Sequence, residues 1–196
     1  MNKDDHYDEG FSENSGVKIF YRDYGPKDGD PILMVHGLGA QLVHWPIHLI
    51  NFLQANNFRP ITYDNRDVGL SSRFLNTPSF VMDYVKYFLR LPIKSEYTID
   101  DMARDGINLL DTLNIKKTHI FSTSMGGMIA QIITAQYPER IKSFTLIAST
   151  ASTPSPTNAP KKAVRDIMME RSKNPNASHE EAVSYTHLTL PTTPYV

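Results

Sequence analysis

Short apolar stretches alternate with polar, glycine-rich or proline-rich loops along the chain. Segments 7–13 and 17–24 flank the turn-forming cluster Asn14-Ser15-Gly16. The second segment is rich in β-branched and aromatic residues, so the pair predicts a β-hairpin. Further short strands are predicted at PILMVH (31–36), PITY (60–63), HIF (119–121) and FTLI (144–147). The first two of these are continuous apolar runs, which are typical of strands covered on both faces.

Between these strands, apolar residues recur at helical spacing. Thr98 is a typical N-cap, and Asp101 lies three positions later, in the capping-box position. Pro138 ends another apolar helical segment. The predicted helices cover 44–56, 98–113, 125–137 and, as an insertion over the candidate site, the aromatic segment 80–91.

The order of the predicted elements indicates the fold class. After the opening hairpin, strands alternate with helices. This order predicts an α/β fold, with a mostly parallel sheet and helices on both faces. The stretch STPSPTNAP at 152–160 is a proline-rich linker, and a new amphipathic helix is predicted to start at Lys161.

The last residues of the chain differ in character from those before them. Segment 183–196 has no charged residue, whereas segment 161–182 is heavily charged. The simplest interpretation is a polar, β-prone tail. However, all ten residues of VSYTHLTLPT (183–192) match the in-frame translation of a transposase-type sequencing-library adapter. We therefore expect 183–196 to be a non-native tail, with natural sequence ending near Ala182.

Composition excludes several classes of protein. The 196 residues include 20 Lys and Arg and 21 Asp and Glu, a net charge of −1 that argues against a large nucleic-acid-binding surface. No apolar run could span a bilayer. The chain has no cysteine, which excludes disulfides, thiolate metal sites and a cysteine nucleophile. The acidic start MNKDDHYDEG is unlike a secretory signal, so a cytoplasmic location is the default expectation.

The strongest chemical signal lies between a predicted strand and a predicted helix. A sharp strand-to-helix turn lifts one hydroxyl above the sheet edge and requires small neighbours. Ser124 is the candidate nucleophile, with Gly126 two positions after it and Ser122 two positions before it, where glycine is usual. The helix N-terminus would aim backbone N–H groups at developing negative charge. The small residues of the motif are Ser122, Ser124, Gly126 and Gly127. The alternative interpretation is a helix start that carries no catalytic residue.

A second motif follows the strand predicted at 31–36 and consists of His36, Gly37, Leu38 and Gly39. A glycine loop there can present a backbone N–H beside Ser124. The N–H groups of Leu38 and Met125 are then predicted to form an oxyanion hole. Taken alone, this loop is better explained as a tight turn. The oxyanion hole is favoured because the glycine loop precedes the Ser124 motif along the chain, in the order that such a site requires.

The segments HGLG, YDNRDVGLSS and STSMGGMIAQ resemble the α/β-hydrolase family, in its branch of single-domain esterase-like enzymes. The resemblance covers about residues 17–151, and YPERIKSFTLIAS also matches. It implies that 1–151 is the N-terminal part of the hydrolase core, that 152–182 is a linker and the start of a cap, and that the last strands are missing. It also implies that Asp64 and Arg66 form a scaffold pair and are not catalysts.

The resemblance further implies a Ser–His–acid triad in which Ser124 attacks a carbonyl, a histidine takes its proton and a carboxylate orients the histidine. In this fold the acid and histidine follow the nucleophile in the last strands. We therefore assign neither the acid nor the histidine in this chain. The histidines and acidic residues that follow Ser124 in the presumed cap segment and tail do not match the family positions: His179, His187, Asp166, Glu170, Glu180 and Glu181. The chain itself is expected to be inactive or nearly so, while its parent gene encodes an enzyme.

The leading function is a cofactor-independent serine hydrolase acting on a small ester or related acyl substrate, with no metal. Esterase, methylesterase, enol-lactonase, carbon–carbon hydrolase and cofactor-free haloperoxidase or perhydrolase activities stay open within the family. A serine nucleophile argues against haloalkane dehalogenase and epoxide hydrolase activity, which in this family use aspartate. The alternative is a non-catalytic ligand-binding protein on the same fold. No nucleic-acid or membrane partner is expected, and the oligomeric state is left open.

Other residues have competing interpretations. His44 and His48 could mimic a metal-binding pair on a helix, although an ordinary helix surface is the better interpretation. His36 is expected to be structural, and His119 to be a strand residue with a satisfied hydrogen bond. A set of apolar residues could line an acyl pocket or belong to the core: Trp45, Met82, Tyr84, Phe88 and Leu91.

Overall fold

A computed structural model describes residues 7–74 and 96–151, all within the first of the chain's two compact units, Met1–Ala151. The predictions for 80–91, 152–182 and 183–196 lie outside the described residues. The strands are β1 (Asp8–Asn14), β2 (Val17–Asp23), β3 (Asp30–Val35), β4 (Phe58–Tyr63), β5 (Thr118–Thr123) and β6 (Ile141–Ile147). The helices are η1 (Leu42–His44), α1 (Ile47–Ala55), α3 (Ile99–Thr112), α4 (Met125–Gln136) and η2 (Pro138–Arg140).

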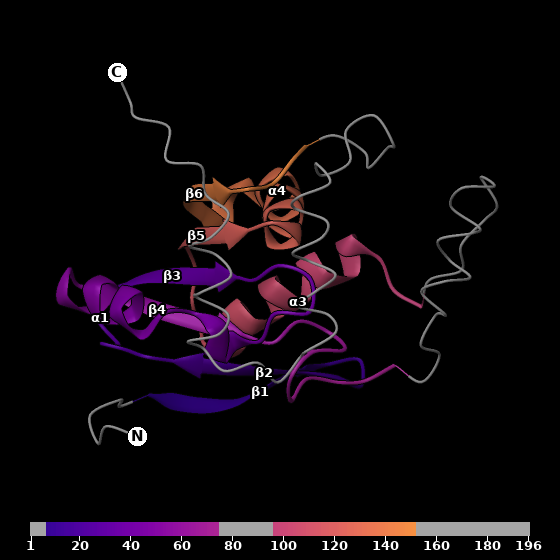
Figure 1. The fold of residues 1–196 in the computed structure, drawn as a ribbon, viewed down its shortest axis with the longest axis horizontal. Coiled ribbons are helices and arrows are strands. Elements are labelled where there is room, and N and C mark those ends of the chain that lie inside the picture. The colour runs from indigo at the N-terminus through magenta and orange to yellow at the C-terminus, as the bar shows by residue number, and fades with distance from the viewer. Residues whose placement is uncertain (1–6, 75–95, 152–196) are drawn as a thin grey trace, which may run out of the picture. The chain divides into compact units, whose positions relative to one another are not determined.

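The strands form one sheet in the order β1-β2-β4-β3-β5-β6 (Figure 1). β1 and β2 pair antiparallel around Ser15 and Gly16, whose φ values of 50° and 80° suit a two-residue hairpin turn. β2 also pairs antiparallel with β4, and the pairs β3–β4, β3–β5 and β5–β6 are parallel. The predicted hairpin and the mostly parallel sheet are confirmed.

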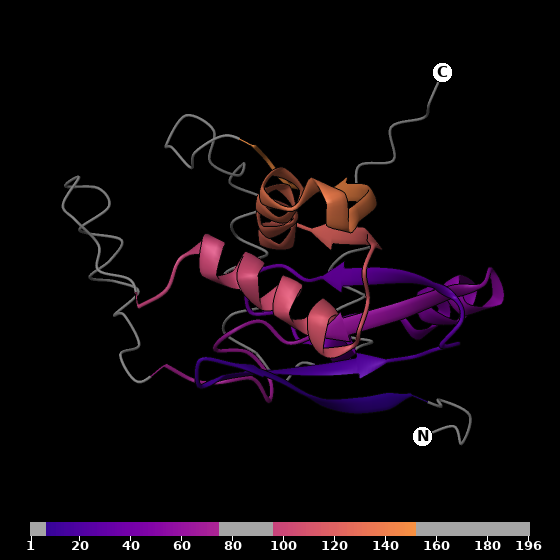
Figure 2. The ribbon, with the colours of Figure 1, turned by 180° about the vertical axis from the view of Figure 1, so that it is seen from behind.

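Alternation along β3 divides the core into two layers. Ile32 and Met34 pack with Ile50 of α1 on one face of the sheet. Leu33 and Val35 pack on the other face, in a cluster that includes residues of α3 and α4. Figures 1 and 2 show α1 on one side and α3 with α4 on the other. Helices therefore cover both faces, as the sequence predicts.

The helix predicted from His44 begins later than expected. Leu42–His44 forms a separate 3-10 turn, and α1 starts at Ile47, after Pro46. A proline disfavours helical backbone in the residue before it, and Trp45 is accordingly extended. His44 and His48 therefore do not share a helix, and the metal-pair geometry considered for them is wrong. Ile47 is 44% exposed, so the buried stripe of α1 comprises Ile50 and Leu53.

The start of α3 carries the predicted capping box. The Thr98 hydroxyl accepts a 3.3 Å hydrogen bond from the Asp101 N–H, and the Asp101 carboxylate accepts a 2.7 Å bond from the Thr98 N–H. These bonds satisfy N–H groups that a helix start leaves without intrahelical partners. The Thr98 N–H and hydroxyl lower the pKa of Asp101 to about 2.

Thr98→Ala is expected to lower the free energy of unfolding by about 1 kcal/mol. Thr98→Ser, which keeps the hydroxyl, is the matched control and should stay near the parent in urea denaturation. Because the folded pKa of Asp101 lies below its ordinary value of 3.8, its contribution is present above that value. It is lost as pH falls toward about 2. Equal stability of the alanine and serine variants would contradict this role.

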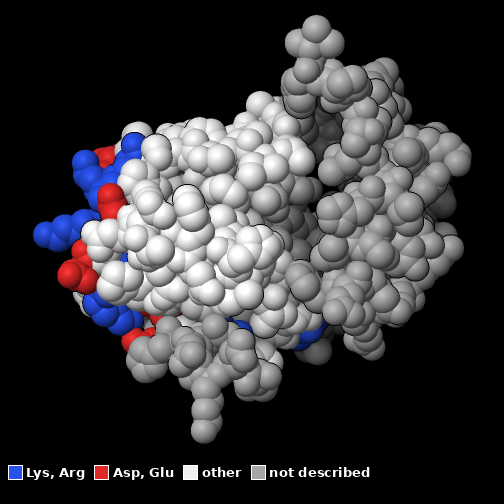
Figure 3. Space-filling model, turned by 60° about the vertical axis from the view of Figure 1, so that its left-hand side comes forward, with Lys and Arg blue, Asp and Glu red and all other residues white. Residues whose placement is uncertain are grey.

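Charged side chains are unevenly distributed over the described surface. Viewed from the side on which α1 lies, they gather along one margin, beside a broad uncharged face (Figure 3). Consistently, α1 contains no Lys, Arg, Asp or Glu and exposes 63% of Phe52. Among the helices described, none combines the length and hydropathy needed to cross a bilayer.

Candidate active site

Ser124 occupies a strained turn at the carboxyl end of β5. Its φ of 52° and ψ of −124° lie outside the regions that non-glycine residues ordinarily adopt. The Ser124 N–H donates a 2.9 Å hydrogen bond to the Ile147 carbonyl, which holds the turn against β6. The Ser124 side chain is exposed, and no described residue hydrogen-bonds its hydroxyl. A hydroxyl in this position is open to a ligand.

Gly126 and Gly127, two and three positions after Ser124, have no side chain because the start of α4 packs closely against neighbouring backbone and side chains. A Cβ at Gly126 would lie 2.2 Å from the Val35 carbonyl oxygen and 2.7 Å from that of His36. A Cβ at Gly127 would lie 2.5 Å from Ser149 Cβ. These approaches explain both glycines, as expected for a sharp turn with small neighbours.

The glycine loop after β3 lies against the same turn. β3 and β5 are adjacent parallel strands, with Val35 opposite Ser122, so the loops after them meet at one sheet edge. A Cβ at Gly37 would lie 3.0 Å from Ser124 Cβ and 3.5 Å from Ser124 Oγ. The structure therefore brings together the two motifs that the sequence predicts to lie side by side.

Backbone donors are available around this edge. Leu38 is 72% exposed, Gly39 has a φ of 68°, and Met125 is the first residue of α4. Within the described ranges, no hydrogen bond engages the backbone N–H of Leu38 or Met125. The oxyanion hole assigned to these two groups stays a prediction.

Ser122 has a structural role at the end of β5. Its side chain is buried, and its hydroxyl donates a 2.9 Å hydrogen bond to the Thr145 carbonyl of β6. The serine that replaces the usual glycine of the motif is thus accommodated by a bond to the neighbouring strand.

Asp64 holds two loops beside the site. Its carboxylate accepts a 2.7 Å hydrogen bond from the Leu42 N–H and a 3.0 Å bond from the Leu70 N–H. Gly69, with a φ of 52°, passes so close that a Cβ there would lie 1.9 Å from Asp64 Oδ2. Asp64 is therefore a scaffold residue, as the resemblance implies.

Arg66 is also a scaffold residue, but its partner is not Asp64. Its guanidinium forms two hydrogen bonds with the buried carboxylate of Asp105 on α3, at 2.5 and 2.9 Å. Burial raises the pKa of Asp105, and the bonds from Arg66 offset only part of that effect. The two residues of the expected pair therefore do not bind each other. Asp64 binds backbone N–H groups of two loops, and Arg66 binds Asp105 of α3.

Asp67, Phe74 and Tyr97 form, with Arg66, a cluster that we call the stem clamp. Asp67 accepts a 2.8 Å bond from the Phe74 N–H and a 2.7 Å bond from the Tyr97 hydroxyl. The two rings lie 5.0 Å apart, and the Arg66 guanidinium lies 5.4 and 5.5 Å from their centroids. Burial, followed by the Asp67 carboxylate, raises the pKa of Tyr97 to about 12. Sequence reasoning missed this cluster, since Tyr97 follows Asp67 by 30 positions.

The histidine and tryptophan near the site pack as a stack. His36 lies 4.0 Å from the Trp45 ring, and Trp45 makes an edge contact with Phe121. Trp45 is 7% exposed and belongs to the core on the α1 face, which supports the core interpretation of this residue. Met82, Tyr84, Phe88 and Leu91 lie outside the described residues. In the described part of the chain, no three His, Asp or Glu side chains gather as a metal site requires.

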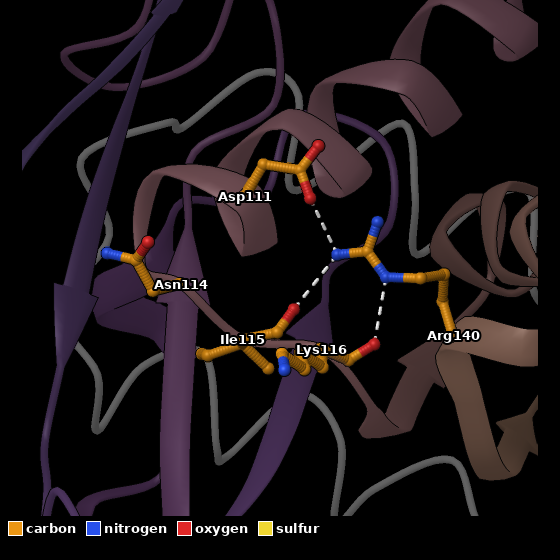
Figure 4. Close-up of a pocket in the computed structure, with 5 residues that line it drawn as sticks. All are labelled: Asp111, Asn114, Ile115, Lys116 and Arg140. Atoms are coloured by element: carbon orange, nitrogen blue, oxygen red, sulfur yellow. Dashed lines mark hydrogen bonds and ion pairs between the residues drawn. The ribbon is translucent and has the colours of Figure 1, made fainter.

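A surface pocket of about 340 Å³ lies at the opposite end of the sheet, between the end of α3, the connection that follows it, and η2 (Figure 4). Its Arg140 side chain donates to Asp111 at 2.7 Å and to the carbonyls of Ile115 and Lys116 at 2.9 Å. These bonds tie the connection between α3 and β5. The hydrogen bonds of Arg140 are thus used to hold the chain between α3 and β5. We therefore take the Ser124 turn, and not this pocket, as the candidate active site.

Comparisons with known proteins agree with this architecture. A family model described as "alpha/beta hydrolase fold" matches residues 30–187. The chain is 26% identical over 131 residues to rhodomycin D methylesterase DauP of Streptomyces sp. (strain C5), which covers 67% of this chain and 39% of that protein. It is 26% identical over 137 residues to the non-heme chloroperoxidase of Streptomyces lividans, which covers 69% of this chain and 42% of that protein.

Among solved structures, the chain is similar to a carboxylesterase crystal structure from Nitrososphaera gargenis. The TM-score is 0.62 at 20% identity, covering 96% of this chain and 60% of the other. This likeness shows the fold. The chain spans about two fifths of the length of the methylesterase and of the chloroperoxidase.

Proposed function

This chain belongs to the α/β hydrolase fold family, and from that premise we propose that it is the N-terminal part of a serine hydrolase acting on small ester or related acyl substrates. The observation that carries the proposal is the exposed Ser124 hydroxyl on a turn with φ of 52°. A positive φ at a serine strains the backbone, and such strain is kept only where the surrounding structure enforces it. In this family the strained strand-to-helix turn is the position that presents the nucleophile. The methylesterase among the relatives supports an ester as substrate.

The proposed reaction begins with attack of Ser124 Oγ on the substrate carbonyl carbon. A histidine base takes the hydroxyl proton and gives it to the departing alcohol, which leaves an acyl-serine that water hydrolyses. The N–H groups of Leu38 and Met125 are proposed to stabilise the oxyanion. The start of α4 adds the positive end of a helix dipole there.

The base and acid are proposed to come from a longer protein of which this chain is a part, from residues after those that the structure describes. Among the described residues, none is hydrogen-bonded to Ser124 Oγ. A serine hydroxyl without a base is a weak nucleophile. We therefore infer that the 196-residue chain turns over esters slowly or not at all, while the longer protein is active.

The test uses the longer protein, obtained by sequencing the source DNA past the codon for Ala182 and expressing the whole reading frame. A fluorophosphonate probe should label the parent protein at the peptide containing Ser124. Ser124→Ala should abolish that label and reduce hydrolysis of short acyl p-nitrophenyl esters by at least about 10³-fold. Ser15→Ala, which removes an exposed turn serine, is the matched control.

A folded, longer protein whose Ser124 peptide is never labelled would overturn the hydrolase proposal and favour a ligand-binding protein on this fold. Labelling together with peroxide-dependent halogenation, in place of ester hydrolysis, would favour the chloroperoxidase-like alternative that one of the relatives suggests.

A further inference from the structure

A serine–histidine–aspartate arrangement lies at the amino ends of the parallel strands, away from Ser124. Asp30 is the first residue of β3, His119 the second of β5 and Ser143 the third of β6. His119 Nδ1 lies 2.7 Å from Ser143 Oγ, and His119 Nε2 lies 3.2 Å from Asp30 Oδ2. His119 and Ser143 are register partners on the paired strands. Three neighbouring strands thus each contribute one member of a hydrogen-bonded chain.

The direction of the hydrogen bonds follows from the acceptor at one end. An ionised carboxylate can only accept, so Asp30 requires that His119 Nε2 carry the proton. In the neutral imidazole, His119 Nδ1 is then an acceptor, and the Ser143 hydroxyl donates to it. Lys142 also pairs with Asp30 and lowers the pKa of that carboxyl, which keeps it ionised. This is the protonation pattern of a hydroxyl activated by a general base.

The ring of His119 is held in place and the serine is accessible. Phe58 contacts the His119 ring edge-on at a centroid distance of 5.7 Å, and the His119 side chain is 25% exposed. Ser143 itself is exposed. The cluster is distinct from the Ser124 site because the two lie at opposite ends of β5. The five positions from His119 to Ser124 span about 16 Å of strand.

We propose that Ser143 is a second acyl-acceptor site, acylated by activated esters with His119 as base and Asp30 as the residue that orients it. Ser143 Oγ bonds to the ester carbonyl carbon, and its proton passes to His119 Nδ1. The bond from that carbon to the leaving oxygen breaks. The leaving group departs as an alcohol or phenol with that proton, and Ser143 keeps the acyl group.

The surroundings of Ser143 favour a stoichiometric modification over turnover. α3 and α4 end just before β5 and β6 begin, so the negative ends of their dipoles lie near this edge of the sheet. Such a field opposes an oxyanion, whereas the start of α4 at Ser124 favours one. The positive charge of Lys142 lies nearby, but it is paired with the Asp30 carboxylate. The field opposes both steps, but an activated ester can still acylate Ser143 because its phenolate is a good leaving group. Hydrolysis of acyl-Ser143 must expel the poorer serine alkoxide without oxyanion stabilisation, so we expect acyl-Ser143 to accumulate.

The test treats the 196-residue chain carrying Ser124→Ala with p-nitrophenyl acetate and maps acetylated peptides by mass spectrometry. This background keeps the result independent of the proposed function. Ser143 should be acetylated at least about 10-fold faster than Ser15, an exposed serine of the β1–β2 turn without a histidine contact. Alkaline hydroxylamine applied to the digested peptides should remove the acetyl group from Ser143 and leave acetyl-Lys142 intact, which separates the two adjacent acceptors.

Variants assign the roles. His119→Gln should bring the Ser143 rate down to that of Ser15, and Asp30→Asn should reduce it several-fold. Lys18→Gln, which removes an exposed lysine of the β1–β2 hairpin that pairs with Glu13 and not with the cluster, is the matched control and is expected to keep the rate advantage. Circular dichroism checks folding, and parent protein in urea should lose the difference between Ser143 and Ser15. The proposal is overturned if Ser143 reacts no faster than Ser15, or if its rate is unchanged in His119→Gln.

Discussion

Gly126→Ala is expected to lower the free energy of unfolding by about 3 kcal/mol, at the upper end of the range for overpacking substitutions. The added methyl would lie 2.2 Å from the Val35 carbonyl oxygen, which is backbone and belongs to a buried central strand. No side-chain rotation relieves such a contact, so α4 or β3 must shift. Because α4 begins directly after Ser124, the same shift should displace the serine turn.

The matched control is Gly106→Ala, another glycine within a helix. Its methyl would meet the end of the Ile133 side chain at 3.1 Å, which can move. The gain in helix propensity of about 1 kcal/mol offsets that contact, so this variant should stay near the parent. Urea denaturation midpoints measure both. If Gly126→Ala were as stable as Gly106→Ala, the close packing of α4 on β3 would be wrong.

Arg66→Met is expected to cost about 3–5 kcal/mol, because it leaves the Asp105 carboxylate buried without its partner. Asp105 is 5% exposed and receives both of its charge-assisted bonds from Arg66. The double variant Arg66→Met/Asp105→Leu removes both charges and should recover most of the loss. Recovery would show that the cost comes from the uncompensated charge and not from the lost contacts of the arginine with Phe74 and Tyr97.

The destabilisation by Arg66→Met should also depend on pH. Burial already raises the folded pKa of Asp105, and removal of Arg66 raises it further. A carboxyl with a raised folded pKa contributes stability at low pH, and this contribution is lost as pH rises through that folded pKa. The variant should therefore lie closer to the parent near about pH 4 than at about pH 7. A pH-independent difference in chemical denaturation would contradict an unpaired Asp105.

Local patterns in the sequence predicted much of the fold. The Asn14-Ser15-Gly16 cluster located the hairpin, the Thr98 and Asp101 pair located the start of α3, and apolar runs located the parallel strands. The Ser124 turn and the Gly37 loop were predictable because each is a contiguous motif that follows a strand. The late start of α1 was missed, although Pro46 carried the signal.

Contacts between distant residues could not be predicted in the same way. Arg66 and Asp105 are 39 positions apart, and their pairing depends on how α3 crosses the sheet. The sequence predicted that His119 has a satisfied hydrogen bond, and that is confirmed. Its partners Ser143 and Asp30, however, follow from the strand order and from the register of β5 on β6. Neither is readable from one sequence.

The stem clamp affects how this part of the chain can change in evolution. Asp67 joins Phe74 to Tyr97, so the two ends of the intervening stretch are fixed to each other independently of its length. Changes in chain length between positions 74 and 97 should therefore leave the clamp and the bond from Arg66 to α3 in place. The clamp thus separates the sheet from sequence variation between its two ends.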